Sequence, residues 1–196
     1  MRNAEATKKL LIRESANLFN TQGYKATSIS DITKATGYTK GAIYRHFENK
    51  EDLERQALAS LSELMFDRLG ELVREAPTFQ KKFDAVFSFF VNYMNAPLYE
   101  GGCPLLNAAV ETDDSNQVLR EQTCKMLQKL KQSITKMFEN GIKNKQVNPA
   151  IDIQYYTNLF ISTLEGAVMI SKLEKDPTAI KHAVTHLRTQ VDQVSL

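Results

Sequence analysis

Residues 27–50 read TSISDITKATGYTKGAIYRHFENK, and this stretch decides the fold. Ser28 and Asp31 form the pattern of a capping box, in which a hydroxyl and a carboxylate satisfy backbone N–H groups in the first turn of a helix. Gly37 occurs where a chain that leaves a helix needs a left-handed residue. Thr39 follows two positions later and can cap a second short helix. The stretch therefore predicts a helix, a tight turn and a second helix.

The second helix, which we expect to run from Thr39 through Phe47, has one face suited to nucleic acid. Ile43 and Phe47 are able to bury, while the small residues Gly41 and Ala42 permit a close approach. An outward face that is rich in hydrogen-bond donors suits a helix lying in a major groove. The outward side chains are Thr39, Lys40, Tyr44, Arg45 and His46.

A third helix is expected to start at Lys50. Asn49 can cap it, with Asp52 at its third position. Lys50 then lies at the N-terminal end of this helix, where the helix dipole and the ammonium group would both attract a phosphate.

Positive charge is concentrated in the first quarter of the chain. The 196 residues together have a formal net charge of +2. Residues 1–50 carry nine Lys and Arg against four Asp and Glu, a balance of +5, so the remaining residues are net negative by 3. Attraction to phosphates requires such a local excess. The charge pattern thus supports nucleic-acid binding by the N-terminal segment.

The order of residues in and around the turn resembles the DNA-binding domain of TetR/AcrR-type bacterial transcriptional repressors. Much of the pattern lies outside the turn itself, which separates it from a chance glycine between two helices. The matching residues are Gly23-Tyr24, Thr27-Ser28, Asp31-Ile32, Gly37, Lys40-Gly41, Tyr44, His46-Phe47, Lys50 and Leu53.

The resemblance implies a helix-turn-helix domain whose recognition helix spans Thr39 to Arg45. It also implies phosphate contacts from Thr27, Ser28, Tyr44, His46 and Lys50. Taken singly, each of these side chains could equally be an ordinary polar or basic group on the surface. The residues predicted to bind DNA are Thr27, Ser28, Tyr38, Thr39, Lys40, Gly41, Ala42, Tyr44, Arg45, His46 and Lys50.

Helical periodicity continues through the rest of the chain without an alternating strand pattern. We therefore expect an all-α fold. Residues 1–49 would form the N-terminal three-helix helix-turn-helix domain, and residues 50–196 a larger C-terminal helical domain for ligand binding and dimerisation, as the resemblance implies. The longer helices are expected over residues 4–21, 50–75, 78–95, 104–112 and 115–144, with two more opening at Asn148-Pro149 and Asp176-Pro177.

Aromatic and other apolar residues are dense in the larger domain. Such residues at helical spacing form a hydrophobic core, and some of them also suit the wall of a ligand cavity. Under the resemblance, a small and partly apolar effector would bind there. The candidate ligand-binding residues are Phe66, Phe87, Phe90, Tyr93, Met94, Cys103, Asn107, Met126 and Phe160.

The expected function is that of a ligand-responsive, DNA-binding transcriptional regulator. It would be a homodimeric repressor that binds a palindromic operator in double-stranded DNA and is released by a small molecule. The last two helices resemble the dimerising pair of the family, although they could instead complete the core of a monomer. No signal peptide or membrane span is indicated, so we expect a cytoplasmic protein.

The alternative function is an all-α small-molecule-binding or thiol-reactive enzyme that uses Cys103. This residue precedes Pro104 at an expected helix start, where the dipole favours a thiolate. Gly-Cys-Pro also resembles a sequence found in a subset of the family, some of whose members sense electrophiles or oxidants through a thiol. We expect Cys103 to be an inert, reduced cysteine in a pocket wall, with a thiol sensor as the second hypothesis for this residue. No nucleophile elbow, phosphate loop or zinc-ligand series supports catalysis, so no enzyme, cofactor or metal is expected. We expect Cys103 and Cys124 to be free thiols, and His182 and His186 to form a solvated helix face.

Overall fold

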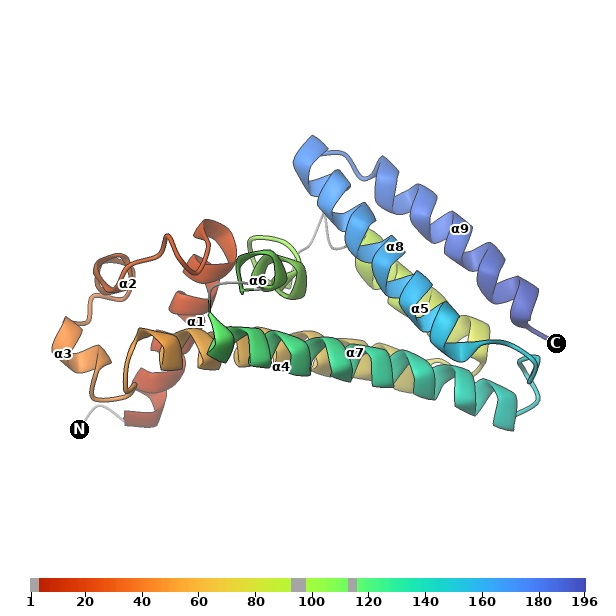
Figure 1. Ribbon diagram of the computed structural model, residues 1–196, viewed down its shortest axis with the longest axis horizontal. Coiled ribbons are helices and arrows are strands. Elements are labelled where there is room, and N and C mark those ends of the chain that lie inside the picture. Colours follow the sequence, from red (N-terminus) through yellow and green to blue (C-terminus); the bar gives the residue numbers. More distant parts are fainter. Residues whose placement is uncertain (1–3, 93–97, 113–115) are drawn as a thin grey trace. The chain divides into compact units, whose positions relative to one another are not determined.

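The computed structural model describes residues 4–92, 98–112 and 116–196. Among these residues the only β-type pairing is an isolated bridge between Val147 and Ser195, and the predicted all-α fold is confirmed. The helices are α1 (Ala4–Gln22), α2 (Ile29–Thr36), α3 (Lys40–Ile43), α4 (Lys50–Glu75), α5 (Phe79–Asn92), α6 (Pro104–Thr112), α7 (Gln117–Lys143), α8 (Ile153–Glu174) and α9 (Thr178–Val194) (Figure 1).

The chain divides into two compact units. Met1–Leu64 and Tyr99–Met126 form the first unit, and Met65–Leu98 and Leu127–Leu196 form the second. Packing therefore groups α6 with the N-terminal helices, because α6 contacts α1. The expected boundary after residue 49 concerns function, and it stays a prediction.

The first unit has a small core to which each of its first four helices contributes an apolar side chain. Phe19, Ile32, Ile43 and Leu53 are fully buried. Phe19 also stacks on Tyr24, with ring centroids 5.2 Å apart. Burying one such side chain is worth roughly 1.5–3 kcal/mol, and this burial stabilises the packing of α2 on α1 and on α3.

The second unit is built around an aromatic cluster. The ring of Phe83 on α5 lies 5.1 Å from that of Phe138 on α7 and 5.1 Å from that of Phe160 on α8. Phe79 and Phe87 extend the cluster along α5. Helix α9 packs on α5 and on α8 (Figure 1). The periodic Phe residues of the sequence thus form mainly core.

Helix α3 is shorter than predicted. It ends at Ile43, and the N–H of His46 donates to the carbonyl of Ile43 at 2.9 Å, which closes a tight turn. Asn49 is the cap of α4, and its Oδ1 accepts from the N–H of Asp52 at 2.8 Å. A cap residue has a non-helical backbone, so α3 cannot continue into α4.

The predicted helix start at Asn148-Pro149 is wrong. The side chain of Asn148 accepts from the N–H of Ala150 at 3.0 Å and forms a local turn. Helix α8 begins only at Ile153, where Asp152 is the N-cap and accepts from Tyr155 at 3.0 Å. The other long helices start within one or two residues of their predicted positions. Residues 93–95, at the predicted end of the helix over 78–95, and residue 115, at the predicted start of the next long helix, lie outside the described residues.

Candidate nucleic-acid interface

The start of α2 is the capping box that the sequence predicts. The Oγ of Ser28 accepts from the N–H of Asp31 at 3.2 Å, and the carboxylate of Asp31 accepts from the N–H of Ser28 at 2.9 Å. The Ser28 hydroxyl, followed by the Ser28 N–H, lowers the pKa of Asp31 below its ordinary value. The cap therefore keeps its charged form at neutral pH.

The turn between α2 and α3 also follows the predicted geometry. Gly37 has a φ of 71°, in the left-handed region that favours glycine. Thr39 is the N-cap of α3, and its hydroxyl accepts from the N–H of Ala42 at 3.2 Å. These contacts present α3 with a fixed orientation in the first unit.

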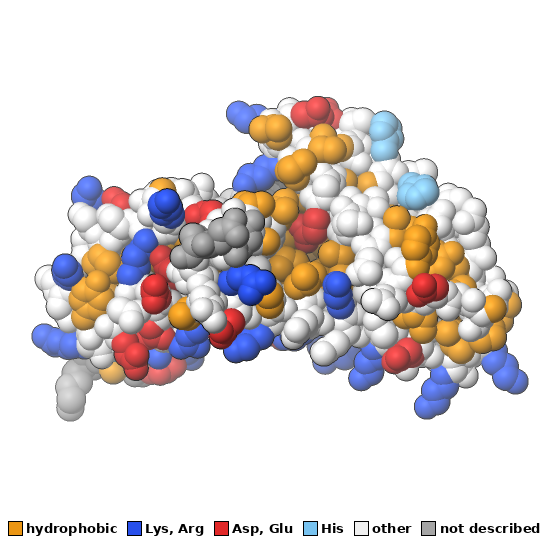
Figure 2. Space-filling model, in the orientation of Figure 1, with side chains coloured by type: hydrophobic (Ala, Val, Ile, Leu, Met, Phe, Trp, Pro, Cys, Tyr) orange, Lys and Arg blue, Asp and Glu red, His pale blue; other side chains and the backbone are white. Residues whose placement is uncertain are grey.

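Most side chains predicted to bind DNA are accessible. The amine of Lys40 lies 5.9 Å from the ring centroid of Tyr44, so a donor at the start of α3 and one at its C-cap lie together. Lys and Arg side chains are spread over the α2 and α3 end of the first unit (Figure 2). Ser28, Thr39, Lys40, Gly41, Tyr44 and Arg45 are exposed, and Tyr38, Ala42, His46 and Lys50 are half-buried.

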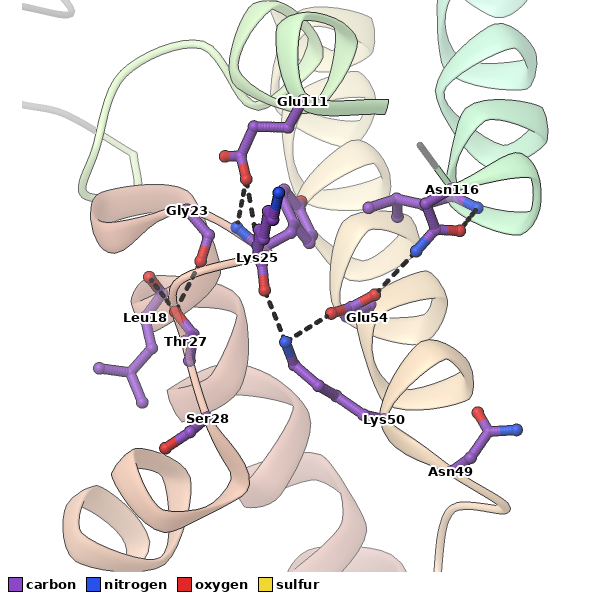
Figure 3. Close-up of polar contacts among 12 residues, drawn as sticks. Leu18, Gly23, Lys25, Thr27, Ser28, Asn49, Lys50, Glu54, Glu111 and Asn116 are labelled. Carbon is purple, nitrogen blue, oxygen red and sulfur yellow. Dashed lines mark hydrogen bonds and ion pairs between the residues drawn. The ribbon is translucent and has the colours of Figure 1, made fainter. Parts of the chain in front are cut away.

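Thr27 differs from the other predicted contacts because it is completely buried. Its hydroxyl donates to the carbonyl of Gly23 at 2.7 Å, and its backbone N–H donates to the same carbonyl at 3.1 Å. Figure 3 shows the side chain turned toward the end of α1. Neither donor of Thr27 is available to a phosphate in this structure, so the residue holds the loop before α2.

Lys50 is the first residue of α4, and its side chain bridges α4 and that loop (Figure 3). Its Nζ donates to the carbonyl of Tyr24 at 2.7 Å and lies 3.1 Å from the carboxylate of Glu54. Because the ammonium has three N–H groups, a phosphate contact by Lys50 has to share the amine with these two partners. The phosphate role of Lys50 stays a prediction.

Glu54 is a buried carboxylate, with 4% of its surface exposed. Burial raises its pKa, and the hydrogen bond and charge of Lys50 counteract part of that rise. Its other oxygen accepts from the side-chain amide of Asn116 at 3.2 Å, just before α7 (Figure 3). The spacing of Lys50 and Glu54 by four residues could have indicated their pairing, whereas no sequence signal indicates Asn116.

Glu111 on α6 binds the loop that follows α1. Its carboxylate accepts from the backbone N–H of Tyr24 at 2.9 Å and of Lys25 at 3.1 Å (Figure 3). The approach is close, since a Cβ at Gly23 would lie 2.9 Å from this carboxylate. Sequence reasoning missed this contact because its two sides are more than eighty residues apart.

Asn20 and Asn107 form a second connection within the first unit. The amide of Asn20 donates to the carbonyls of Glu100 and Gly102, and the amide of Asn107 donates to Asn20 and to the carbonyl of Gly101. Asn107 was predicted to bind a ligand, but its amide is used here to hold the segment before α6 against α1.

A cavity of about 590 Å³ lies in the second unit, between α4, α5, α7 and α8. Of the predicted ligand residues, Phe66 and Phe90 line it. Phe87 and Phe160 belong to the aromatic cluster, because their rings contact each other and Phe83. The other candidates fall elsewhere: Cys103, Asn107 and Met126 belong to the first unit, and Tyr93 and Met94 lie outside the described residues.

Both cysteines are free thiols, as predicted, and Cys103 is buried while Cys124 is exposed. His182 and His186 are exposed on α9. The residues that the structure describes contain no cluster of His, Cys, Asp and Glu that could hold a metal ion. Nor does any helix among them have the length and apolar character needed to cross a membrane.

Two family models match the chain, and together they cover most of it. Residues 11–57 match the model of bacterial regulatory proteins of the tetR family. Residues 80–187 match the tetracyclin repressor-like C-terminal domain. The N-terminal match contains α2 and α3, and the C-terminal match contains α6, α7 and α8 with nearly all of α5 and part of α9.

Characterised relatives are regulators. AcrR of Shigella flexneri is 39% identical over 80 residues, which are 41% of this chain and 34% of AcrR, so the match spans about a third of that protein. The repressor DhaR of Mycobacterium sp. strain GP1 is 20% identical over 176 residues, with 89% of this chain and 87% of DhaR covered.

Solved structures share the fold over nearly the whole chain. A TetR transcriptional regulator from Chloroflexus aurantiacus has a TM-score of 0.94 and 36% identity, with 100% of this chain and 98% of that chain covered. A cysteine mutant of the TetR-family regulator CifR in complex with a 26-bp operator has a TM-score of 0.84 at 16% identity, with 92% and 94% covered. The enzyme alternative is not favoured by these matches. The chain belongs to the TetR family and is a DNA-binding transcriptional regulator.

Proposed function

We propose that the protein is a homodimeric repressor that leaves a palindromic operator when a small molecule binds in the second unit. It would act in the cytoplasm, where bacterial DNA lies. The observation that carries the proposal is the pair of exposed cations Lys40, in α3, and Arg45, just after it, on a helix-turn-helix whose two short helices are capped by Ser28 and Thr39.

Each subunit would place α3 in one major groove. Lys40 and Arg45 are exposed cations on this side of the unit and are suited to base edges or phosphates. Ser28, Tyr44 and His46 would contact the phosphates on either side. In a symmetric dimer the two copies of α3 would lie roughly 34–36 Å apart, which is one turn of DNA.

Dimerisation through α8 and α9 is supported by an apolar stripe on α8. Tyr155, Met169 and Leu173 are 56%, 51% and 82% exposed. They lie on one side of the helix, because their spacings of 14 and 4 residues are close to whole turns. Gly166 falls on the same side, and a Cβ there would meet nothing within 4 Å. A second α8 could approach closely along this stripe.

The cavity in the second unit is the proposed effector site. A ligand shifts DNA binding only if it binds the non-DNA-binding arrangement more tightly than the other. Helices α4 and α7 both line the cavity and both contribute residues to the first unit. They are therefore the elements through which we expect the two sites to be coupled.

The proposal is tested by titrating the DNA upstream of the protein's own gene, with fluorescence anisotropy at moderate salt. The double variant Lys40→Ala, Arg45→Ala should weaken binding by more than about tenfold, since a good base contact is worth roughly 1–3 kcal/mol. Arg120→Ala, Lys125→Ala removes two exposed cations from α7 and is the matched control. Equal losses in the two double variants would reject α3 as the DNA-binding element.

A further inference from the structure

Three of the four Lys and Arg side chains that line the cavity of the second unit lie at one end. Arg74 lies near the end of α4 and Lys82 near the start of α5. Their proximity follows from the amine of Lys82, which donates to the carbonyls of Val73 and Ala76 at 2.7 and 2.8 Å. Lys136 approaches the same end from α7, because Phe138, two residues later, contacts Phe79 at the start of α5.

The opposite end of the cavity is apolar and acidic. Phe66 on α4 and Phe90 on α5 lie two turns or more from the cationic end of their helices. Helix α8 runs parallel to α5, because Phe138 contacts both Phe79 and Tyr156, near the two helix starts, whereas Phe160 reaches Phe87 further along. Glu165 follows Phe160 by more than one turn, so it lies toward the Phe90 end of the cavity. Lys129 is the cation at this end, and its amine lies 4.4 Å from the ring centroid of Phe66.

The wall between these two ends is almost entirely apolar. Leu69, Val86, Ile134 and Leu164 contribute to it from four different helices. Lys129 and Asn140, the first and last lining residues on α7, are eleven positions apart, which corresponds to about 16 Å along the helix. The cavity is therefore long enough for an extended chain and has a different charge at each end.

We propose that the effector is an elongated amphiphile with an anionic head group, which Arg74 and Lys136 bind while the apolar tail extends toward Phe66 and Phe90. This inference rests on the proposed role of the cavity as the effector site. The guanidinium group matches a carboxylate or phosphate in geometry, and Lys136 adds a point charge. At the other end the carboxylates of Asp67 and Glu165 outnumber the single amine of Lys129, so the charges disfavour a head group that enters in the reverse direction.

The experiment compares three probes with the same tail, dodecanoate, dodecanol and dodecylammonium, by isothermal titration calorimetry on the full chain without DNA. Dodecanoate should bind more than about tenfold more tightly than the other two, since hydrogen bonds to charged groups are worth roughly 1.5–3 kcal/mol. The variant Arg74→Gln, Lys136→Gln should lose this preference. Lys143→Gln, an exposed lysine of α7 outside the cavity lining, should keep it.

Equal binding of the three probes, binding of none, or tighter binding of dodecylammonium would overturn the inference. Because these measurements contain no DNA, they are judged separately from the regulatory proposal. Dodecanoate that binds as expected but leaves operator affinity unchanged would instead contradict the effector role of the cavity.

Discussion

Glu111 on α6 accepts a hydrogen bond from the backbone N–H of Tyr24, in the loop that leads from α1 to α2. The same carboxylate accepts from the next N–H at 3.1 Å. Helix α6 follows α5 in the chain, yet it is bound to the loop that leads into the helix-turn-helix.

Replacing Glu111 by Ala should destabilise the first unit by roughly 1.5–3 kcal/mol and weaken operator binding. The reason is that two backbone donors lose a charged acceptor. Urea unfolding and anisotropy titration measure the two effects. Glu139→Ala on α7 removes an exposed carboxylate and is the control; a similar result for both variants would show that charge alone was responsible.

Glu54 predicts a pH dependence of stability. Its pKa is raised in the folded state by burial, so the folded protein binds a proton more tightly than the unfolded chain does. The contribution of Glu54 to stability therefore falls as the pH rises from the ordinary glutamate value of 4.5 to the higher folded value, and is constant above it. Glu54→Gln should remove this decrease. Urea unfolding of both proteins across this pH range checks the prediction, which fails if their curves stay parallel.

The two glycines Gly37 and Gly101 should differ in their response to alanine. Both have positive φ, 71° and 93°, which costs a non-glycine residue about 1–2 kcal/mol. A Cβ at Gly37 meets nothing within 4 Å, whereas one at Gly101 would lie 2.2 Å from the carbonyl oxygen of Asn20. Gly101→Ala should therefore lower the free energy of unfolding by at least about 1 kcal/mol more than Gly37→Ala does. Thermal unfolding of the two variants measures the difference, and equal losses would contradict the close approach at Gly101.

Local signals in the sequence were sufficient for the elements that carry the helix-turn-helix. The caps of Ser28 and Thr39 and the left-handed Gly37 depend on neighbours within three or four residues, and all three are confirmed. The predicted helix start at Asn148 was wrong because an Asn followed by proline also fits a local turn. Asp152, four residues later, is the residue that caps α8.

The predicted ligand residues stay a prediction, and the sequence could not show which of them line the cavity. Helical periodicity identified apolar residues but could not separate core from cavity wall, so Phe160 and Phe66 looked alike. The hydrogen bond between Asn107 and Asn20 could not be foreseen, because the two residues are eighty-seven positions apart in the sequence. Asn107 was therefore predicted to bind a ligand. Contacts of this kind depend on tertiary packing, which a single sequence does not encode in any local pattern.

The α8 stripe should control dimerisation. The double variant Met169→Glu, Leu173→Glu introduces charges onto residues that are 51% and 82% exposed, so it should hardly affect folding of the subunit but should oppose an apolar interface. Sedimentation analysis should show a dimer for the parent protein and a monomer for the variant. Val110→Glu, at a residue of α6 that is 68% exposed, is the control. A monomeric parent protein, or a variant that stays dimeric, would refute the proposed interface.

The two thiols should react at different rates. Cys124 is exposed on α7, whereas Cys103 is 6% exposed at the start of α6. Because a disulfide reagent must reach the sulfur, one thiol per chain should react rapidly with Ellman's reagent in the folded protein and the second only slowly. Cys124→Ser should remove the rapid phase, and Cys103→Ser should leave it. If the rapid phase disappeared in Cys103→Ser instead, the buried thiol would be the reactive one, as a thiol sensor at Cys103 requires.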